Sequence, residues 1–573
     1  MKFSTYVNSP RQKYLNLSLL DILLVLFLIV ATVVFNLRMI KDGINGMIDM
    51  QWHILWLQHF SKQLSAGILY PRWLSGTNYG YGSPTFVFYP PLTYYIGSLI
   101  KATGLNIENT LIFSYSLALF LSGFNCYLFC RDRWGSIAGF CGALAYMSMP
   151  YLAFNTYWVS SLSVAYGIAL IPLCWWLTDK SLASPKWKIG IALFWTVLAL
   201  THLPTLLLCG LVWLFYVLFL LPQYSWKNIV ATFFFSGIGL GIAAFFLIPA
   251  IVEQKYVDID SMKNVIGDIS NAVLGAGLPL IPQKFDFHIS HIFFHQSLVV
   301  LSLGLISFLC LRKQDKVFQS SIFWLIFLLA LAFMMSSLSL PIWRSSSTLQ
   351  KVQAPWRLLS IFSFASSALF ANTVLGIFNI KGKIKYGLSF ILIGLLLFNF
   401  SYGYKLAQKF PTFRNPGRAS LAHLETSKNA LEKPFSEEIL DVGEYRPALS
   451  SLEPAPDPLL TQPKVSVIEG NANITTVKWS DYQRNFDINV TTPATIKIRT
   501  YYYPAWHLYI DNKSHPLQHF SDGTMAFALQ PGNYNNIELR YQKTPAFKLG
   551  LAVSFVFVLL LLFSSIKLLF VSG

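Results

Sequence analysis

The stretch that decides the fold runs from residue 49 to residue 99 and reads DMQWHILWLQHFSKQLSAGILYPRWLSGTNYGYGSPTFVFYPPLTYYIGSL. It follows the first apolar run and is too polar to lie in hydrocarbon. Asp49, His53 and Lys62 recur at helical spacing, with Trp56 and Phe60 between them. One ionisable edge and one apolar edge predict a short amphipathic helix that lies along a membrane surface.

Two turns rich in aromatic residues follow this helix. The first contains Tyr70, Arg72 and Trp73, and the second contains Tyr79 and Tyr81 among glycines and a proline. Loops of this kind often line sites for flat or ring-shaped ligands. We therefore expect this segment to contribute to a binding site.

The composition indicates a polytopic membrane protein. Of 573 residues, 54% are hydrophobic and 12% are charged, and the mean hydropathy is +0.50, whereas soluble domains carry about 25% charged residues. The net charge of +17 comes from Lys and Arg in short clusters between apolar runs. Positive-inside topology produces this pattern, so nucleic acid is not an expected partner. All six cysteines lie in apolar segments, which favours packing over disulfides or metal binding.

Twelve apolar runs are candidates for membrane-spanning helices of about 20 residues. We interpret the first run as a retained span and not as a signal peptide. The runs are Leu17–Phe35, Thr110–Cys130, Gly135–Leu152, Ser161–Leu177, Ile189–Leu200, Pro204–Leu221, Ile229–Ile251, Ser297–Leu311, Ser320–Leu340, Leu358–Phe378, Tyr386–Tyr402 and Phe547–Phe570.

A further run, Phe86–Ala102, is ambiguous because Pro90 and Pro91 interrupt it. If it does not cross, the basic loops after it all fall on the side of the N-terminus, as positive-inside topology requires. We therefore predict about 12 to 13 transmembrane helices with both termini cytoplasmic. The segments expected to face outward are Arg38–Asn109, Glu253–Gln296, Pro341–Arg357 and Lys405–Thr544.

The last outward segment predicts a separate domain. From Lys464 the chain shows about seven short alternating runs separated by Gly, Pro, Asn and Asp, which is typical of a small antiparallel β-sandwich. We expect a transmembrane domain over residues 1–404, with its first outer loop at 38–109. An extracytoplasmic β-rich domain over 405–545 and a final transmembrane helix over 546–573 follow.

Asp49 is the leading candidate for chemistry. A carboxylate just past a span can simply be solvated or cap a helix, but His53 lies one turn on, where the two side chains can share a proton or orient each other. Metal ligation by this pair is conceivable, but two ligands do not make a site. The cofactor therefore stays unknown, with a divalent metal possible and no metal ligands assigned. The spacing of His288, His291 and His295 is a weak zinc pattern for which an interfacial stretch is the favoured explanation.

A second candidate stretch contains Gln353, Trp356 and Arg357 at an outer membrane boundary. The Arg357 guanidinium suits a bidentate grip on phosphate, although snorkelling would also satisfy it. His202 breaks the apolar pattern at an outer helix end, and Glu253 marks another outer end more weakly. No P-loop, GxSxG or CxxC motif is present in the sequence, so ATP-driven transport has no support.

These motifs resemble a family of bacterial membrane proteins labelled "6-pyruvoyl-tetrahydropterin synthase-related", which are relatives of the YfhO-type proteins. The resemblance rests on the segment from Asp49 to His53, on Tyr89 in FYPPL, and on QAPWR at 353–357, which is similar to the family's QFPWR motif. Tyr503-Pro504-Ala505-Trp506 resembles the YfhO-type β-domain. The label does not imply pterin chemistry. One departure is that residues 157–172, YWVSSLSVAYGIALIP, lack the Arg and Glu of an RGxxxE-like stretch.

The wider resemblance is to GT-C glycosyltransferases, which place an acidic residue in the first outer loop and use a polyprenyl-phosphate-linked sugar donor. It implies that Asp49 is the general base, that His53 orients it and that Arg357 contacts the phosphate. The remaining expected substrate-binding residues are Tyr70, Arg72, Trp73, Tyr79, Tyr81, Tyr89, His202, Glu253, Gln353 and Trp356. Tyr70, Trp73, Tyr79 and Tyr81 would stack on sugar rings.

The expected function is therefore transfer of a sugar from a polyprenyl-phosphate-linked donor to a glycan, lipid or protein acceptor at the outer face of the cell membrane. The lipid bilayer, the donor and the acceptor are the expected partners. Two alternatives stay open. A lipid-glycan transporter should carry ionisable residues deep within its spans, and these spans have few. A non-catalytic scaffold with a glycan-binding β-domain is favoured by the missing Arg and Glu.

Overall fold

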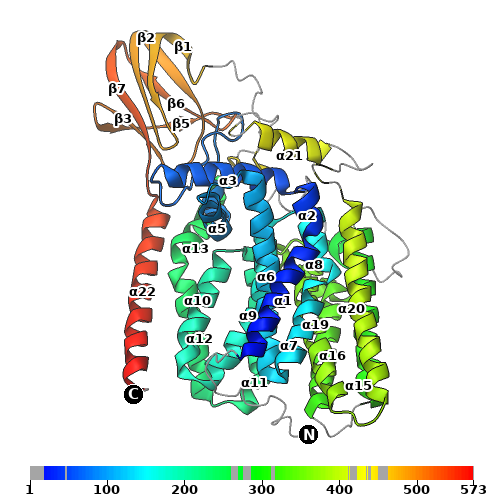
Figure 1. Ribbon diagram of the computed structural model, residues 1–573. Coiled ribbons are helices and arrows are strands. Elements are labelled where there is room, and N and C mark those ends of the chain that lie inside the picture. The colour runs from blue at the N-terminus through cyan, green and yellow to red at the C-terminus, as the bar shows by residue number, and fades with distance from the viewer. Residues whose placement is uncertain are drawn as a thin grey trace.

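The computed structural model describes residues 18–44, 48–259, 269–274, 286–310, 316–410, 412, 414, 422–433, 435, 441–448 and 463–571. Figure 1 shows a bundle of roughly parallel helices with a β-domain at one end. Helix α3 lies across that end of the bundle, between the helices and the β-domain, and α22 returns along the bundle to the opposite end.

The first half of the chain alternates long helices with short pieces at the β-domain end of the bundle. Its helices are α1 (Leu19–Phe35), α2 (Leu37–Asp42), α3 (Met50–Ser65), α4 (Thr85–Phe88), α5 (Leu92–Lys101), α6 (Ile107–Trp134), α7 (Ser136–Met147), α8 (Pro150–Phe154), the π-helical turn Asn155–Val159, α9 (Leu162–Ala183) and α10 (Lys188–Ala199).

The second half completes the bundle and adds the β-domain. Its helices are α11 (Leu203–Leu220), α12 (Trp226–Ile242), α13 (Ala244–Val252), α15 (Asp286–Cys310), α16 (Lys316–Met335), α17 (Leu340–Arg344), α18 (Ser347–Gln350), α19 (Leu359–Phe378), α20 (Ile384–Lys409), α21 (Ala422–Glu432) and α22 (Pro545–Val571). Short 3-10 turns include Glu253–Tyr256, Pro355–Leu358 and Gly443–Tyr445.

Within the described residues, nine helices are long and apolar enough to cross a membrane, and the bent pair α12 and α13 makes a tenth. The shorter apolar helix α1, with 17 residues, and the helix α10, with 12, coincide with the remaining predicted runs. Each of the twelve predicted runs therefore appears as a helix or a bent pair. The chain is a polytopic helical membrane protein with a C-terminal antiparallel β-domain and a final apolar helix.

The ambiguous run does not form a long helix. Its residues form α4 and α5, which have 4 and 10 residues and are separated by Pro90 and Pro91. A helix of 10 residues rises about 15 Å, half the thickness of the hydrocarbon layer. In Figure 1, α5 lies beside α3 at the β-domain end. Our topology prediction assumed that this run does not cross the membrane, and the two short helices are consistent with that assumption.

The β-domain contains seven antiparallel strands. They are β1 (Val465–Trp479), β2 (Gln483–Tyr501), β3 (Trp506–Ile510), β4 (Lys513–His515), β5 (Gln518–His519), β6 (Thr524–Leu529) and β7 (Gly532–Tyr541), in the order β4-β3-β7-β2-β6-β5 with β1 on β2. The strands form one connected sheet instead of the two of a sandwich, because the long β2 pairs with β7, β6 and β1. The domain boundaries that we predicted, after residue 404 and after residue 545, remain predictions.

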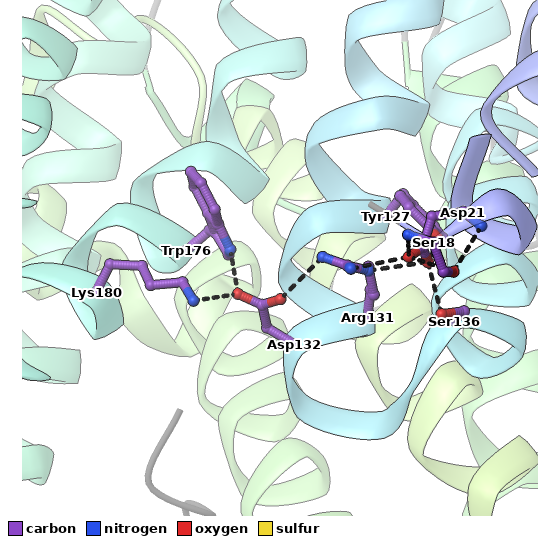
Figure 2. Close-up of polar contacts among 8 residues, drawn as sticks. All are labelled: Ser18, Asp21, Tyr127, Arg131, Asp132, Ser136, Trp176 and Lys180. Carbon is purple, nitrogen blue, oxygen red and sulfur yellow. Dashed lines mark hydrogen bonds and ion pairs between the residues drawn. The ribbon is translucent and has the colours of Figure 1, made fainter. Parts of the chain in front are cut away.

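A polar network joins the helix ends at the end of the bundle opposite the β-domain (Figure 2). Asp21 of α1 accepts from Tyr127 at 2.5 Å, from Ser136 at 2.6 Å and from Arg131 at 2.9 Å. Beside it, Asp132 binds Lys180 at 2.6 Å. Because each buried charge has an opposite charge and hydrogen bonds, this network fixes α1, α6, α7 and α9 relative to one another.

The final helix packs closely against the bent pair. The axes of α12 and α13 differ by 69° at the break, and the N–H of Phe245, at the start of α13, donates to the Ser554 hydroxyl of α22 at 2.8 Å. A Cβ on Gly550 would lie 2.7 Å from the carbonyl oxygen of Ala244. Glycine therefore permits the contact that anchors α22, and with it the last strand of the β-domain, to the bundle.

Candidate functional site

Helix α3 carries the predicted site and is enclosed on both sides. Its apolar face packs on the bundle, while its polar side chains contact later parts of the chain: Gln58 Nε2 donates to the Ala430 carbonyl at 3.0 Å, and Gln63 Nε2 donates to the Trp73 carbonyl at 2.8 Å. The predicted helix is confirmed, but most of its polar edge does not face water: His53, Gln58 and Gln63 are buried, while Lys62 is exposed. Helix α21 and the loop that contains Trp73 cover the buried part of this edge, which a local sequence pattern cannot reveal.

Asp49 occupies the position immediately before α3. Its side chain makes no capping hydrogen bond, so the carboxylate is not used to start the helix. Its backbone N–H donates to the Val159 carbonyl at 3.0 Å, which holds it against the turn before α9. Burial raises the pKa of Asp49 to about 7, although the charge of Arg357 and hydrogen bonding to Ser161 act to lower it. A carboxyl with this pKa suits proton transfer near neutral pH.

Arg357 lies in the 3-10 turn Pro355–Leu358 that leads into α19. Its guanidinium donates to Gln353 Oε1 at 2.5 Å, and Gln353 itself has a left-handed backbone with φ of +69°. The charge of Arg357 acts on Tyr151, Asp49 and Tyr89. The structure thus brings together two residues that lie 308 positions apart in the sequence, as the enzyme hypothesis requires.

Tyr89 and the serines before α9 complete the surroundings of Asp49. The Tyr89 ring lies 4.6 Å from the Trp56 ring, and the side chains of Ser163, Ser161 and Tyr94 act to lower the pKa of its hydroxyl. Burial raises the pKa of Tyr89 to about 12, so the phenol stays protonated. The two serines belong to the stretch that lacks the expected Arg and Glu, so hydroxyl groups stand here in place of charges.

His53 does not orient Asp49 through its side chain, so that prediction was wrong. His53 Nε2 accepts from the Leu162 N–H at 3.2 Å, and Nδ1 lies 2.6 Å from the Tyr94 hydroxyl. Both ring nitrogens are therefore occupied, and burial lowers the pKa of His53 to about 3. The neutral ring links α3 to α5 and α9, and so holds together the helices beside Asp49.

His202 lies near this group as the cap of α11. Its Nδ1 is 2.8 Å from the Thr205 hydroxyl, which explains the residue as a helix cap. Burial lowers the pKa of His202, and the charge of Arg357 lowers it further. Trp356, next to Arg357, is buried. His202 is therefore a neutral group near Arg357.

The aromatic loop packs against the β-domain instead of facing a ligand. Trp73 has no exposed surface, and its ring lies 5.6 Å from the rings of both Trp506 and Tyr541. Tyr81 is 7% exposed, and its ring lies 5.1 Å from that of Tyr501. The prediction that Trp73 and Tyr81 stack on sugars was wrong, because these rings form the docking surface of the β-domain. Tyr79 is half-buried on the same loop.

Tyr70 and Arg72 tie the same loop to α22. The Tyr70 hydroxyl donates to the Phe86 carbonyl at 2.6 Å. The Arg72 guanidinium lies 4.0 Å from the centre of the Phe547 ring and 5.3 Å from that of Tyr541. These contacts replace the substrate contacts that we expected for the two residues, and they fix the loop between the bundle and the β-domain.

Glu253 also belongs to the β-domain interface and not to the surroundings of Asp49. It is buried and accepts a hydrogen bond from the Tyr503 hydroxyl. The prediction that Glu253 binds substrate was therefore wrong, because its carboxylate joins the end of α13 to the β-domain. Since α13 also contacts α22, this end of the bundle holds the domain at two places.

Two acidic residues that no sequence pattern singles out follow α21 in the chain. Asp441 accepts from Trp56 Nε1 at 2.8 Å and from the Thr85 hydroxyl at 2.5 Å. Glu444 lies in the following 3-10 turn, and burial raises its pKa to about 7, with smaller increases from Asp441 and Asp49. Both residues lie in a proline-rich stretch with no periodic pattern, so no sequence signal pointed to them.

Two of the three histidines of α15, His288 and His295, contact different neighbours. The His288 ring lies 5.3 Å from the Trp158 ring, and His295 Nε2 lies 3.1 Å from Asn399 Oδ1. Among the described residues, no group of three or more His, Cys, Asp or Glu side chains is arranged to hold a metal ion.

Comparison with known proteins gives one family and several distant structures. Residues 86–407 match the family model described as the 6-pyruvoyl-tetrahydropterin synthase related domain, a membrane protein. No curated protein matches the chain. Among solved structures, the arabinofuranosyltransferase AftD from Mycobacteria is 11% identical over 69% of this chain, with a TM-score of 0.43, and this chain covers 27% of its length.

Two further structures are similar at the same low level. ArnT from Cupriavidus metallidurans bound to undecaprenyl phosphate is 12% identical over 73% of this chain and 89% of its own, with a TM-score of 0.30. The Archaeoglobus fulgidus oligosaccharyltransferase in complex with Zn and sulfate is 13% identical over 69% of this chain and 54% of its own, with a TM-score of 0.33.

The family match covers more than half of the 573 residues. It includes Tyr89, Ser161 and Arg357, three of the residues around Asp49, and most of the helices of the bundle. The family resemblance inferred from the sequence motifs is thus confirmed: this chain belongs to the 6-pyruvoyl-tetrahydropterin synthase related family of membrane proteins.

Proposed function

We propose that this protein is a membrane glycosyltransferase that moves a sugar from a polyprenyl-phosphate-linked donor to a hydroxyl group of a glycan, lipid or protein acceptor. The observation that carries the proposal is that Asp49 and Arg357 lie close enough for their charges to act on each other. One group is a carboxyl with a pKa of about 7, and the other is a guanidinium whose charge acts on it. Both lie at one end of the helix bundle, where a lipid-linked donor would present its phosphate.

The two groups would divide the reaction between them. The acceptor oxygen attacks the anomeric carbon of the sugar while the bond from that carbon to the phosphate oxygen breaks. The acceptor proton passes to the Asp49 carboxylate, and the phosphate leaves with the bonding electron pair. Arg357 offers a planar pair of N–H groups to the phosphate as its negative charge increases. Base catalysis of this kind contributes about 10²- to 10⁴-fold to a rate.

We further propose that α3 and the β-domain lie on the outer side of the cell membrane. The support is the charge of the opposite end of the bundle, where Arg131 and Arg133 lie in the last turn of α6 and Lys180 lies in the last turn of α9. Positive residues concentrate on the cytoplasmic side of membrane proteins. The donor lipid and the acceptor would then meet at the outer surface.

A non-catalytic scaffold is the second candidate. The burial of Trp73 and Tyr81 favours it, because the loop that we expected to bind sugars serves instead to mount the β-domain. The transporter alternative has less support. A transporter should carry ionisable residues deep within its spans, whereas Asp21, the acidic residue of α1, lies in a polar network at the end of the bundle.

Binding of undecaprenyl phosphate to the purified protein in nanodiscs tests the proposal. Arg357→Lys keeps the charge but loses the planar pair of donors, so we expect the dissociation constant to rise about 10-fold or more, the effect of losing a hydrogen bond to a charged group. Arg344→Lys is the matched control, since Arg344 is an exposed residue of the nearby α17. Equal affinity of wild type and Arg357→Lys would contradict the proposed phosphate contact.

A further inference from the structure

The arginines of the helix bundle have two kinds of partner. At the end opposite the β-domain, Arg131 binds the Asp21 carboxylate through Nε at 3.0 Å and Nη2 at 2.9 Å, and Arg133 forms an ion pair with Asp179. In both pairs the carboxylate compensates the charge of the guanidinium and occupies its donors. These two arginines therefore join helices and have no uncompensated charge for a further anion.

Arg357 is half-buried, as Arg131 and Arg133 are, but its partner is a neutral amide. Its Nη2 donates to Gln353 Oε1 at 2.5 Å. Among the described residues, no carboxylate oxygen lies within 4.0 Å of the Arg357 nitrogens, and Nη1 and Nε have no hydrogen-bond partner. Burying a cation is costly unless an anion compensates it. The amide of Gln353 thus holds this guanidinium and leaves its charge available.

The backbone of Arg357 is fixed without the help of Gln353. The Arg357 N–H donates to the Ala354 carbonyl at 3.1 Å, and the Arg357 carbonyl accepts from the Ser360 hydroxyl at 2.7 Å. These two bonds fix the start of the side chain, but the guanidinium lies at the end of a long and flexible stem. Within the described part of the chain, the hydrogen bond to Gln353 is the one that orients it.

Gln353 makes this contact from an unfavourable backbone conformation. Its φ is +69°, a left-handed conformation that glycine and asparagine adopt more readily than glutamine does. Pro355 restricts the residue before it to an extended conformation, and Ala354 has φ of −142° and ψ of 119°, so the chain turns at Gln353 instead. Strained residues of this kind concentrate at functional sites. A glutamine here is explained if its side chain has a use that offsets the strain.

We propose that Gln353 is the positioning residue of the phosphate site: its amide oxygen orients the Arg357 guanidinium without neutralising it, so that the cation stays available for a phosphate. This inference rests on the proposed function. The N–H groups of Nη1 and Nε are left to bind phosphate oxygens. A carboxylate at position 353 would hold Arg357 more strongly, but it would turn the site into a closed ion pair like that of Arg131 and Asp21.

Gln353→Glu separates orientation from charge. In the full-length protein in nanodiscs, its melting temperature should equal or exceed that of wild type, because an ion pair replaces a neutral partner. Its dissociation constant for undecaprenyl phosphate should rise roughly 10- to 100-fold, the effect of losing a hydrogen bond between charged groups. Binding of undecaprenol, which lacks the phosphate, should not change. Gln350→Glu adds the same charge three residues away and is the matched control. Unchanged affinity of Gln353→Glu for undecaprenyl phosphate would overturn the proposal.

Gln353→Gly tests whether Gln353 acts through Arg357. Glycine accepts the left-handed backbone, so the melting temperature should not fall, while the dissociation constant for undecaprenyl phosphate should rise about 2- to 10-fold for the lost hydrogen bond. In an Arg357→Lys background the same substitution should have no further effect, because lysine lacks the planar fork that Gln353 orients. An equal effect in both backgrounds would overturn the proposal. Asn512→Gly, at an exposed left-handed position of the β-domain with φ of +62°, is the matched control.

The two proposals fail in different ways. If Arg357→Lys weakens binding of undecaprenyl phosphate but Gln353→Glu and Gln353→Gly do not, the role of Gln353 is refuted, while the proposed function stands. If wild type does not bind undecaprenyl phosphate, or binds it no more tightly than Arg357→Lys does, the proposed phosphate contact fails and the role of Gln353 fails with it.

Discussion

Replacing Asp49 with Asn should abolish most of the transfer activity and leave the fold intact. Asn keeps the size of the side chain but cannot take a proton at neutral pH, so the rate should fall about 10²- to 10⁴-fold, which corresponds to about 3 to 5 kcal/mol in the barrier. The Asp49 side chain does not cap α3, and the hydrogen bond from its backbone N–H to Val159 does not involve the substituted atoms. Abundance in the membrane should therefore be unchanged.

The pH dependence of the wild-type rate provides a second readout of the same group. Because burial raises the pKa of Asp49 to about 7, the rate should rise with pH and reach half its maximum near pH 7. Arg357 lowers the pKa of Asp49, so Arg357→Gln should move the rising limb to higher pH. The assay is release of polyprenyl phosphate in membranes of a strain that lacks the gene, supplemented with the purified protein and measured from pH 5 to pH 9.

Stability should change in the direction opposite to activity. The pKa of Asp49 is higher in the folded protein than its ordinary value of 3.8, so the folded state binds the proton more tightly and wild type loses stability as pH rises through the window from about 4 to 7. Asp49→Asn lacks this loss and should unfold at a higher temperature than wild type at pH 8.

More than a tenth of wild-type activity in Asp49→Asn, at equal abundance in the membrane, would refute the role of Asp49 as the base.

Two further predictions concern architecture. Cysteines at Thr103 and Ser514, both exposed, should react with an impermeant maleimide in intact cells. A cysteine at Lys186 should react only after permeabilisation, because basic residues mark the cytoplasmic side. Labelling of Lys186→Cys in intact cells would contradict the proposed topology. Trp73→Ala should destabilise the docked β-domain by about 3 to 5 kcal/mol, the range for deleting a fully buried Trp, and accelerate proteolysis between α20 and β1, whereas Trp226→Ala, at an exposed position, should not.

The helices of the bundle followed directly from the sequence, because long apolar runs must satisfy their backbone hydrogen bonds internally in lipid. Phe86–Ala102 forms two short helices, neither of which is long enough to cross the membrane alone, and the topology that we predicted from the basic loops stays a prediction. The strands were predicted less accurately. Alternation located the strand residues, but the chain continues through Gly470 and Pro493 within β1 and β2. Glycine and proline, which usually end strands, lie at register shifts here.

The candidate site was predicted in part. Asp49 and Arg357 were found because each is a charged residue beside an apolar run, where charge is costly unless it has a purpose or a partner. Tertiary packing decided the rest. Trp73 and Tyr81 pack on a domain more than 400 residues away in the sequence, and Glu253 pairs with Tyr503 of that domain. No local pattern distinguishes an aromatic ring that binds sugar from one that docks a domain.

A density map of the protein in nanodiscs with bound undecaprenyl phosphate tests the central claim most directly. The account predicts that the phosphate lies within hydrogen-bond distance of the Arg357 guanidinium, on the side that faces Asp49 and Tyr89. A phosphate bound at another part of the bundle, with Arg357 turned away from it, would contradict the pairing of Asp49 and Arg357 as the site of sugar transfer.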